Sequence, residues 1–417
     1  MFYKIFLIFC AFLPFQFALN PLEGVDLAVS RIIIPLLFIF WIIISIKNKY
    51  PLIIKNKITY SLVLFALLAV ISLCFSQKIS WSLKKLMFLF SLMPVYFIAA
   101  HLFYEKYRQR KIIIALVAGA GIISLFGLFQ FASQFIFGID FVYSFLAEKI
   151  APFFLGNSFS KEVLSYPSWL VNSDGSTYMR TIANFPDPHM FSYYLEMLMP
   201  WSLVLWATAT KYKKAFLLIF VSILLADIFT FTRGSYVAII AGTLTTLPLV
   251  SRRVVKKLLA GVLFFVLLIM LVPHNPVAGR LISTFDVQEG SNKARISNWQ
   301  QALEIITEKP LGVGIGAYSL EIKPDADYRE PIYAHNLYLD IASELGVLAT
   351  GVFLFLLLYV FIVFWKNAKK NPFFIAGVAS ITIFSIHSLF ENPLFSVHVL
   401  ILFFIIIALS SAVEKYE

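Results

Sequence analysis

The chain has 417 residues, of which 60% are apolar and 14% are charged. Soluble domains are usually about 45–50% apolar and about 25% charged, so a soluble enzyme, a disordered chain and a disulfide scaffold are all excluded. One membrane span needs about 20 mostly apolar residues, and this composition provides for about a dozen spans. The composition therefore predicts an all-α, polytopic membrane protein.

Runs with few or no charged residues predict twelve transmembrane helices. We expect one integrated membrane domain, with nine of these helices in residues 1–273 and three in residues 345–417. Residues 1–19 also fit a cleaved signal peptide, but a single early charge, Lys4, and a long apolar run favour retention as the first span. The predicted spans are 3–19, 27–46, 58–75, 84–103, 112–136, 189–207, 215–231, 234–250, 258–273, 345–365, 373–390 and 395–413.

The 34 basic residues outnumber the 23 acidic ones, and the basic residues cluster in alternate loops. Basic loops mark the cytoplasmic side of a membrane protein, so both termini are predicted to be cytoplasmic. The positive charge is thus a topology signal, and no nucleic-acid partner is expected. The five clusters are Lys47, Lys49, Lys55, Lys57; Lys106, Arg108, Arg110, Lys111; Lys211, Lys213, Lys214; Arg252, Arg253, Lys256, Lys257; and Lys366, Lys369, Lys370.

Two long loops, 137–188 and 274–344, fall on the opposite, outer side. Long loops usually carry function. The first loop ends in Arg180 and the turn Asn184-Phe185-Pro186-Asp187-Pro188, which places Arg180 near the outer membrane surface. The tight turn Thr232-Arg233-Gly234 places Arg233 at the same surface. The position of either arginine alone is also explained without a functional role, because a long side chain at the membrane edge can extend its charged group into water.

The second outer loop contains a predicted amphipathic helix over 292–308, which carries Arg295 and ends before Pro310. Glycines follow at alternate positions in the stretch 312–316. Their spacing does not match a dinucleotide-binding loop, so we expect a close passage of the backbone against another element.

His335 begins the last segment of this loop, and Asn336, Asp340 and Glu344 follow at four-residue spacing on one side of a helix. A neutral imidazole is well suited to accept a proton near pH 7, although a lone histidine is more often structural. His189, His274 and His398 show no metal-ligand spacing. We therefore expect no metal and no other cofactor.

Three outer-face arginines and one histidine suggest a common chemistry. Guanidinium groups grip phosphate oxygens through paired hydrogen bonds, so Arg180, Arg233 and Arg295 suit a lipid-linked diphosphate whose tail stays in the membrane. Such a diphosphate leaves readily once its charge is neutralised, and His335 can take the proton of an incoming sugar hydroxyl. The residues predict a metal-independent glycosyl transfer.

These strings resemble the bacterial O-antigen ligase/polymerase superfamily. The resemblance rests on Arg180 with 184–188, on Thr232-Arg233-Gly234, on Arg295 with 309–314, and on His335-Asn336 with Glu344-Leu345-Gly346. It implies an inverting membrane glycosyltransferase of the bacterial inner membrane with a periplasmic active site. The arginines would hold an undecaprenyl diphosphate-linked glycan, and His335 would activate or orient the acceptor. His189 stands where the family often has asparagine, and it receives no role.

Several activities fit these motifs. A ligase moves the finished glycan onto lipid A–core, whereas a polymerase adds it to a new repeat unit; we favour the ligase. Relatives that modify protein hydroxyls usually have an additional C-terminal region, and only residues 414–417 follow the last predicted span. A transporter of lipid-linked sugars is the alternative of another class. It would place several ionisable groups deep in its spans, where this sequence has few: Glu196, Asp227 and Arg31.

Overall fold

The computed structural model describes residues 1–22, 25–163, 167–173, 175–253, 255–256, 276–283, 290–328 and 331–414. Helices dominate these residues, and two antiparallel hairpins are the sheets among them. The all-α fold class is thus confirmed. Contacts divide the chain into unit 1 (Met1–Val29, Arg110–Asp286, Trp365–Phe384) and unit 2 (Ser30–Gln109, Val287–Phe364, Ser385–Glu417). Each unit therefore collects segments from distant parts of the sequence.

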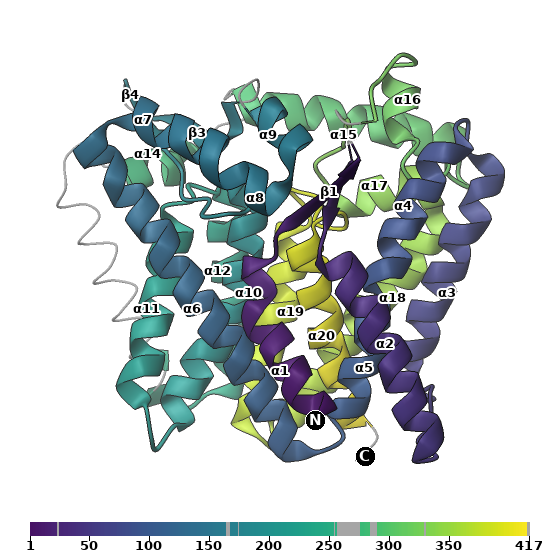
Figure 1. Cartoon of the computed structure of the whole chain (residues 1–417), viewed down its shortest axis with the longest axis vertical. Coiled ribbons are helices and arrows are strands. Elements are labelled where there is room, and N and C mark those ends of the chain that lie inside the picture. The colour runs from purple at the N-terminus through teal and green to yellow at the C-terminus, as the bar shows by residue number, and fades with distance from the viewer. Residues whose placement is uncertain are drawn as a thin grey trace. The chain divides into compact units, whose positions relative to one another are not determined.

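Unit 1 is built around long apolar helices joined by a structured outer loop (Figure 1). The helix α6 belongs to this unit from Arg110 onward, and α19 belongs to it as far as Phe384. The elements are α1 (Phe2–Phe12), β1 (Ala18–Leu22), β2 (Val25–Ala28), α6 (Lys106–Phe137), α7 (Ile139–Phe145), α8 (Ala151–Leu155), α9 (Asn157–Val163), β3 (Leu170–Ser173), β4 (Ser176–Met179), α10 (Pro188–Thr208), α11 (Lys213–Ile228), α12 (Arg233–Thr246), α14 (Pro276–Ser283) and α19 (Ile375–His387).

Local sequence fixes where α10 begins. The Asp187 side chain accepts hydrogen bonds from the backbone N–H groups of His189 and Met190, and Pro188 occupies the first helical turn, where its missing N–H costs nothing. The helix therefore starts at Pro188, as the sequence predicts. Because α10 packs against α11, the residues just before α10 lie close to the turn after α11.

Unit 2 contains the second outer loop and the helices that carry it. The helix α18 belongs to this unit as far as Phe364. The elements are α2 (Ser30–Lys47), α3 (Lys57–Ile71), α4 (Ile79–Leu92), α5 (Pro94–Leu102), α15 (Gly290–Glu308), α16 (Tyr318–Ile322), α17 (Leu337–Leu345), α18 (Val347–Ala368) and α20 (Val397–Glu414).

The outer loop lies at one end of unit 2, beside the connection between α3 and α4 (Figure 1). Ser72 Oγ accepts the backbone N–H of Ile315, and Gln77 Nε2 donates to Glu321 Oε1 at 2.5 Å. The basic connection between α2 and α3 lies at the opposite end of α3 from the connection between α3 and α4. Within unit 2, the basic loop and the outer loop therefore lie at opposite ends, as the alternation of charge predicts.

Five helical segments among the described residues are long and apolar enough to cross a membrane: α2, Lys57–Phe75, Ile79–Leu102, α6 and α18. Phe2–Phe15, Pro372–His387 and Val397–Val413 are shorter apolar helices. The helices α10, α11 and α12 coincide with three further predicted spans. The predicted span 258–273 lies outside the described residues. The total of twelve spans stays a prediction.

The first predicted span, 3–19, is too long. The helix α1 ends at Phe12, a short 3₁₀ turn with Pro14 follows, and Ala18 already pairs with Ala28 in the β1–β2 hairpin. Proline removes a helical hydrogen bond and stops the helix. The apolar run continues into the hairpin, so hydropathy alone could not mark where the helix ends.

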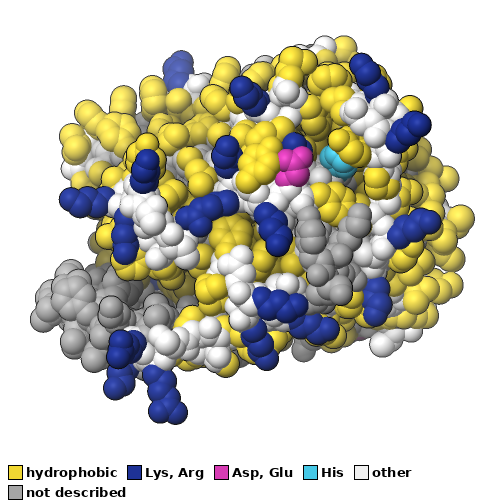
Figure 2. All heavy atoms as spheres, turned by 90° about the horizontal axis from the view of Figure 1, so that it is seen from below, with side chains coloured by type: hydrophobic (Ala, Val, Ile, Leu, Met, Phe, Trp, Pro, Cys, Tyr) yellow, Lys and Arg dark blue, Asp and Glu magenta, His cyan; other side chains and the backbone are white. Residues whose placement is uncertain are grey.

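Exposed basic side chains mark the predicted cytoplasmic loops. Figure 2, drawn from below the view of Figure 1, shows a face on which Lys and Arg side chains far outnumber Asp and Glu side chains. The loops after α2 and α10 supply exposed lysines, among them Lys47, Lys49, Lys211 and Lys214. In each unit taken by itself, such exposed lysines are typical of a cytoplasmic loop of a membrane protein.

Candidate active site

The segment that carries Arg180 is held by two glutamines of α6. Gln130 Nε2 donates to the Arg180 carbonyl oxygen at 2.9 Å, and its Oε1 accepts the backbone N–H groups of Ile182 and Ala183. Gln134 bonds both the backbone N–H and the carbonyl oxygen of Met179. These bonds satisfy backbone polar groups at and just after the end of β4, so the segment is fixed in place.

The Arg180 side chain is buried, and three of its hydrogen bonds reach other residues of unit 1. Nε donates to the Thr230 carbonyl oxygen at 2.6 Å, Nη1 to the Ser168 carbonyl oxygen at 3.2 Å, and Nη2 to Thr232 Oγ1 at 3.1 Å. A guanidinium group has five N–H donors, and at least three of them bind the protein itself. Arg180 therefore ties the end of the first outer loop to the turn between α11 and α12.

Arg233 is the first residue of α12 and is also buried. The turn before it is fixed by Thr230 Oγ1, which donates to the Asp227 carbonyl oxygen, and by Phe231, whose φ is +52°. Since Arg180 bonds Thr232, the neighbour of Arg233, the structure brings these two predicted arginines together in unit 1.

Arg295 and His335 come together in unit 2. Arg295 lies on α15, whose bounds agree with the predicted helix, and α15 packs against α17, the helix that follows His335. The Arg295 charge is close enough to act on the His335 imidazole, where it lowers the pKa. The four predicted residues thus form two pairs, one in each unit.

His335 pairs with a carboxylate that sequence reasoning missed. Its Nδ1 lies 2.9 Å from Glu391 Oε1, and the His335 side chain is 43% exposed while the Glu391 side chain is only 10% exposed. The Glu391 charge raises the pKa of His335 above its ordinary value, and burial opposes this increase without cancelling it. Among the described residues, His335 Nε2 has no hydrogen-bond partner.

Two of the three polar residues that follow His335, Asn336 and Asp340, hold the backbone around it. Asn336 Oδ1 caps α17 by accepting the N–H groups of Tyr338 and Leu339. Asp340 Oδ1 accepts the Ala334 N–H at 2.8 Å, and its Oδ2 accepts Asn392 Nδ2 at 2.9 Å. Asp340 thereby links the residue before His335 to the residue after Glu391.

Glu344 supports the glycine segment instead. Its carboxylate accepts the backbone N–H groups of Gly316 and Tyr318, and it lies near the Lys85 charge. Burial raises the pKa of Glu344 to about 7 despite these favourable partners, and burial likewise raises the pKa of Asp340 to about 7. Lys85, which donates to the Tyr333 hydroxyl at 2.9 Å, is a second group that the sequence did not single out.

The predicted close passage at the glycines is confirmed. Gly312, Gly314 and Gly316 all have positive φ, and a Cβ on Gly312 would lie 2.5 Å from the Glu344 carbonyl oxygen. The backbone N–H groups of Val313 and Gly314 bond the carbonyl oxygens of Ser343 and Glu344. This segment is a structural brace for α17, and it does not cradle a phosphate through its own N–H groups.

Strained backbone marks the predicted segments. Outside glycine, the described residues with φ near +50 to +60° are Lys49, Ala183, Tyr212, Phe231 and His335. Ala183 lies three residues from Arg180, and Phe231 lies two residues from Arg233. His335 is itself the predicted catalytic residue. Such conformations cost about 1–3 kcal/mol and gather at functional sites, which supports the choice of these segments.

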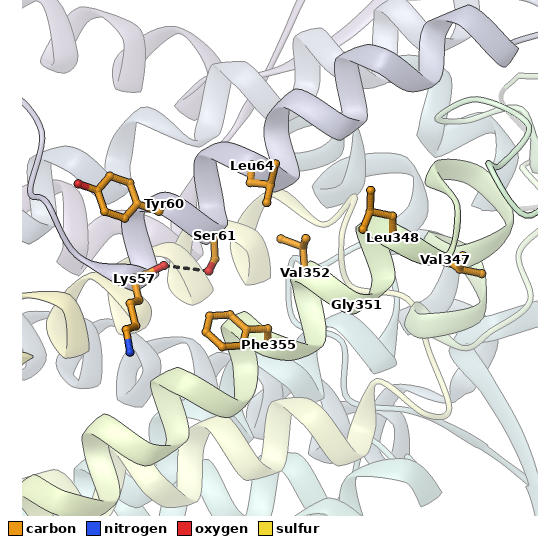
Figure 3. A pocket seen from close by; sticks show the side chains of 9 residues that line it. All are labelled: Lys57, Tyr60, Ser61, Leu64, Val347, Leu348, Gly351, Val352 and Phe355. Atoms are coloured by element: carbon orange, nitrogen blue, oxygen red, sulfur yellow. Dashed lines mark hydrogen bonds between the residues drawn. The ribbon is translucent and has the colours of Figure 1, made fainter.

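An apolar groove lies elsewhere in unit 2, between α3 and α18 (Figure 3). It has a volume of about 430 Å³, and Lys57 is the one charged residue that lines it. The groove contains none of the predicted site residues. Its lining is Lys57, Tyr60, Ser61, Leu64, Val347, Leu348, Gly351, Val352 and Phe355.

Within the described part of the chain, no three His, Cys, Asp or Glu side chains are grouped as metal ligands would be. His189 lies on the first turn of α10 and His398 on α20, while His274 is outside the described residues. The expectation of a metal-independent reaction stays a prediction.

Comparison with known protein families matches residues 215–354 with the family described as O-antigen ligase. This stretch of the chain is therefore similar to the O-antigen ligase family. The resemblance to the O-antigen ligase/polymerase superfamily is thus confirmed. The matched residues include Arg233, Arg295 and His335, whereas Arg180 precedes them and Glu391 follows them. No curated protein matches the sequence. The family match and the apolar helices together support a bacterial membrane protein.

Proposed function

We propose that the protein is an O-antigen ligase that moves a glycan from undecaprenyl diphosphate to a sugar hydroxyl of lipid A–core. The observation that carries this proposal is His335 in the stretch similar to the O-antigen ligase family, with Nδ1 on a carboxylate, Nε2 without a protein partner among the described residues, and the Arg295 charge nearby. A base beside a cation suits a hydroxyl nucleophile and an anionic leaving group.

His335 acts as the general base in this proposal. Its side chain is about half exposed, so a hydroxyl can reach Nε2, and the paired Glu391 carboxylate stabilises the imidazolium that forms. The acceptor oxygen attacks the anomeric carbon from the face opposite the diphosphate, which inverts the configuration. Asn336 and Asp340 support the reaction by holding the backbone on either side of the histidine, and Glu344 holds the glycine segment that packs against α17.

The arginines bind the donor diphosphate. Arg233 and Arg295 supply charge and N–H donors to the phosphate oxygens as the bond to the sugar breaks. Arg180 spends at least three donors on the protein, so it contributes mainly a fixed positive charge and the position of the turn that carries Arg233. Arginines and one histidine supply this chemistry without a metal ion.

The proposed reaction takes place on the periplasmic side of the inner membrane, with both termini in the cytoplasm. The opposite ends of the basic loop and the outer loop in unit 2 support this orientation. The isoprenoid tail of the donor stays in the membrane, and the acceptor approaches from the periplasm.

A polymerase that uses the same donor is the alternative, because the family resemblance covers both activities. A transporter is less well supported by the structure. Asp227, one of the few deep acids, accepts hydrogen bonds from Ser192 Oγ and Ser235 Oγ at 2.5 and 2.7 Å. These bonds give Asp227 a structural role in joining α10, α11 and α12.

Deletion of the gene in its native host, followed by analysis of the glycolipids, tests the proposal. Long polymer that accumulates on undecaprenyl diphosphate is the expected result for a ligase. Single repeat units attached to lipid A–core would instead identify a polymerase. Unchanged glycolipids would contradict both.

A further inference from the structure

His335 and Glu391 lie 56 residues apart in the sequence, yet their side chains form an ion pair or hydrogen bond of 2.9 Å. Glu391 belongs to the short segment before α20, which no predicted motif covers. The carboxylate is largely buried behind the half-exposed imidazole. Glu391 Oε1 also accepts the backbone N–H of Asn392 at 3.2 Å, which helps to fix the carboxylate beside the histidine.

The protein holds this pair in place from two directions. Asp340 accepts hydrogen bonds from both Ala334 and Asn392, the residues next to His335 and Glu391. The Leu337 N–H also donates to the Ser388 carbonyl oxygen at 2.9 Å. These bonds join the two backbone segments, so the distance between imidazole and carboxylate does not depend on the pair alone.

The backbone of His335 is strained, with φ at +52°. A left-handed conformation costs a residue other than glycine about 1–2 kcal/mol. Strain of this kind persists only where the surroundings impose it. Here the side chain of the strained residue contacts Glu391, and the Asn336 cap starts α17 directly after it.

Three charged groups affect the imidazole from α15, from α17 and from the segment before α20. Glu391 and Asp340 raise the pKa of His335, whereas Arg295 on α15 lowers it, and the effect of Glu391 is the largest. Glu391 therefore affects both the orientation and the basicity of the imidazole.

We propose that Glu391 is a positioning residue for the base: it binds the Nδ1–H of His335, directs Nε2 toward the acceptor hydroxyl and stabilises the imidazolium. This inference rests on the proposed function. In the step, the acceptor O–H bond breaks and its proton moves to Nε2. The acceptor oxygen bonds the anomeric carbon, and the electron pair of the sugar–phosphate bond leaves on the lipid diphosphate. The imidazolium afterwards releases its proton to water.

The test compares Glu391→Gln and Glu391→Asp with the wild type in a reconstituted transfer assay over a range of pH. Glu391→Gln keeps the shape but removes the charge, so kcat should fall by roughly ten- to a hundredfold with the donor KM unchanged. The acid limb of the pH profile should move to lower pH. Glu391→Asp keeps the charge, so its acid limb should stay near that of the wild type even if kcat falls. Glu321→Gln removes an outer-loop carboxylate that pairs with Lys309, and it serves as the matched control.

A second readout does not depend on transfer. Diethyl pyrocarbonate reacts with neutral imidazole, and mass spectrometry of the peptide that contains His335 gives the pH midpoint of this reaction. The midpoint should be lower in Glu391→Gln than in the wild type. Protease resistance, recorded on the same sample, shows whether the variant retains its fold.

The outcomes separate this inference from the proposed function. Transfer that survives in His335→Ala would overturn the proposed function. A His335→Ala variant without activity beside a Glu391→Gln variant with wild-type kcat and pH profile would overturn the inference alone. An unchanged midpoint in the modification experiment would also overturn the inference.

Discussion

The two pairs of predicted residues lie in regions of different character. The arginine region of unit 1 (Arg180, Arg233 and the turn 227–232) is buried, and Arg180 is held by hydrogen bonds to the protein. The histidine region of unit 2 (Arg295, His335, Asp340, Glu391 and Asn392) has a half-exposed imidazole in contact with a carboxylate. One region fixes charge in place, and the other keeps a titratable group accessible.

This difference indicates a division of labour. A guanidinium group stays protonated at any physiological pH, so burying and bonding it provides a constant field for an anionic ligand. An imidazole has to change its protonation state during the reaction, so it needs access and a partner that tunes its pKa. In the proposed function, the arginines therefore mainly bind the diphosphate, and the histidine transfers the proton.

The largest expected effect is that of His335→Ala. General base catalysis contributes about 10²–10⁴-fold to a rate, so transfer in a reconstituted assay should fall by that factor. His101→Gln is the control, because His101 packs against the Trp41 and Tyr50 rings away from the outer loop and should leave transfer unchanged. An equal loss in both variants would show a general effect on folding and break the comparison.

Arg180 and Arg295 should differ in stability. Arg180→Ala removes three hydrogen bonds from a buried charged group, each worth about 1.5–3 kcal/mol. The melting temperature of the purified protein should drop by at least roughly 5 °C. Arg295→Ala, on a partly exposed helix, should shift it much less. Similar shifts for both would contradict the contrast between the two regions.

Acid–base behaviour should also distinguish the histidine region. Burial raises the pKa of Asp340 to about 7, above its value of about 3.9 in an unfolded chain. Protonation of Asp340 in the folded protein therefore adds to the free energy of unfolding. This contribution is fully present below about pH 4 and is lost as the pH rises through about 7. The melting temperature should therefore fall over this range, and Asp340→Asn should reduce the fall. If the melting temperature of Asp340→Asn depended on pH as that of the wild type does, Asp340 would not be the cause of the fall.

The smallest expected effect is that of a chelator. Arginines and one histidine perform the proposed chemistry, so transfer should be unchanged when EDTA is added and then removed. Loss of activity that returns with a divalent cation would require a ligand site beyond the two regions.

Much of this arrangement follows from local sequence. The start of α10 at Pro188, the bounds of α15 and the close backbone at Gly312 all depend on residues a few positions apart. Capping, proline and glycine act at this range, so their effects can be predicted from neighbouring residues alone. The resemblance to the O-antigen ligase family likewise rests on such short motifs.

The partners of these residues could not be found in the same way. Glu391 meets His335 only because the segment before α20 packs beside the start of α17, and nothing near either residue encodes that contact. The use of Arg180 as a structural tie depends equally on the packing of α10 against α11. Hydropathy also failed at Ala18, where an apolar run becomes a strand.

Binding of the lipid-linked donor, measured separately from transfer, tests the division of labour most directly. Detergent-purified His335→Ala should bind undecaprenyl diphosphate-linked glycan as the wild type does but fail to transfer it. Arg233→Ala should lose binding by about ten- to a hundredfold, since a charge-assisted hydrogen bond contributes about 1.5–3 kcal/mol, and Arg233→Lys should recover only part of it. Weak binding in His335→Ala, or normal binding in Arg233→Ala, would contradict the account.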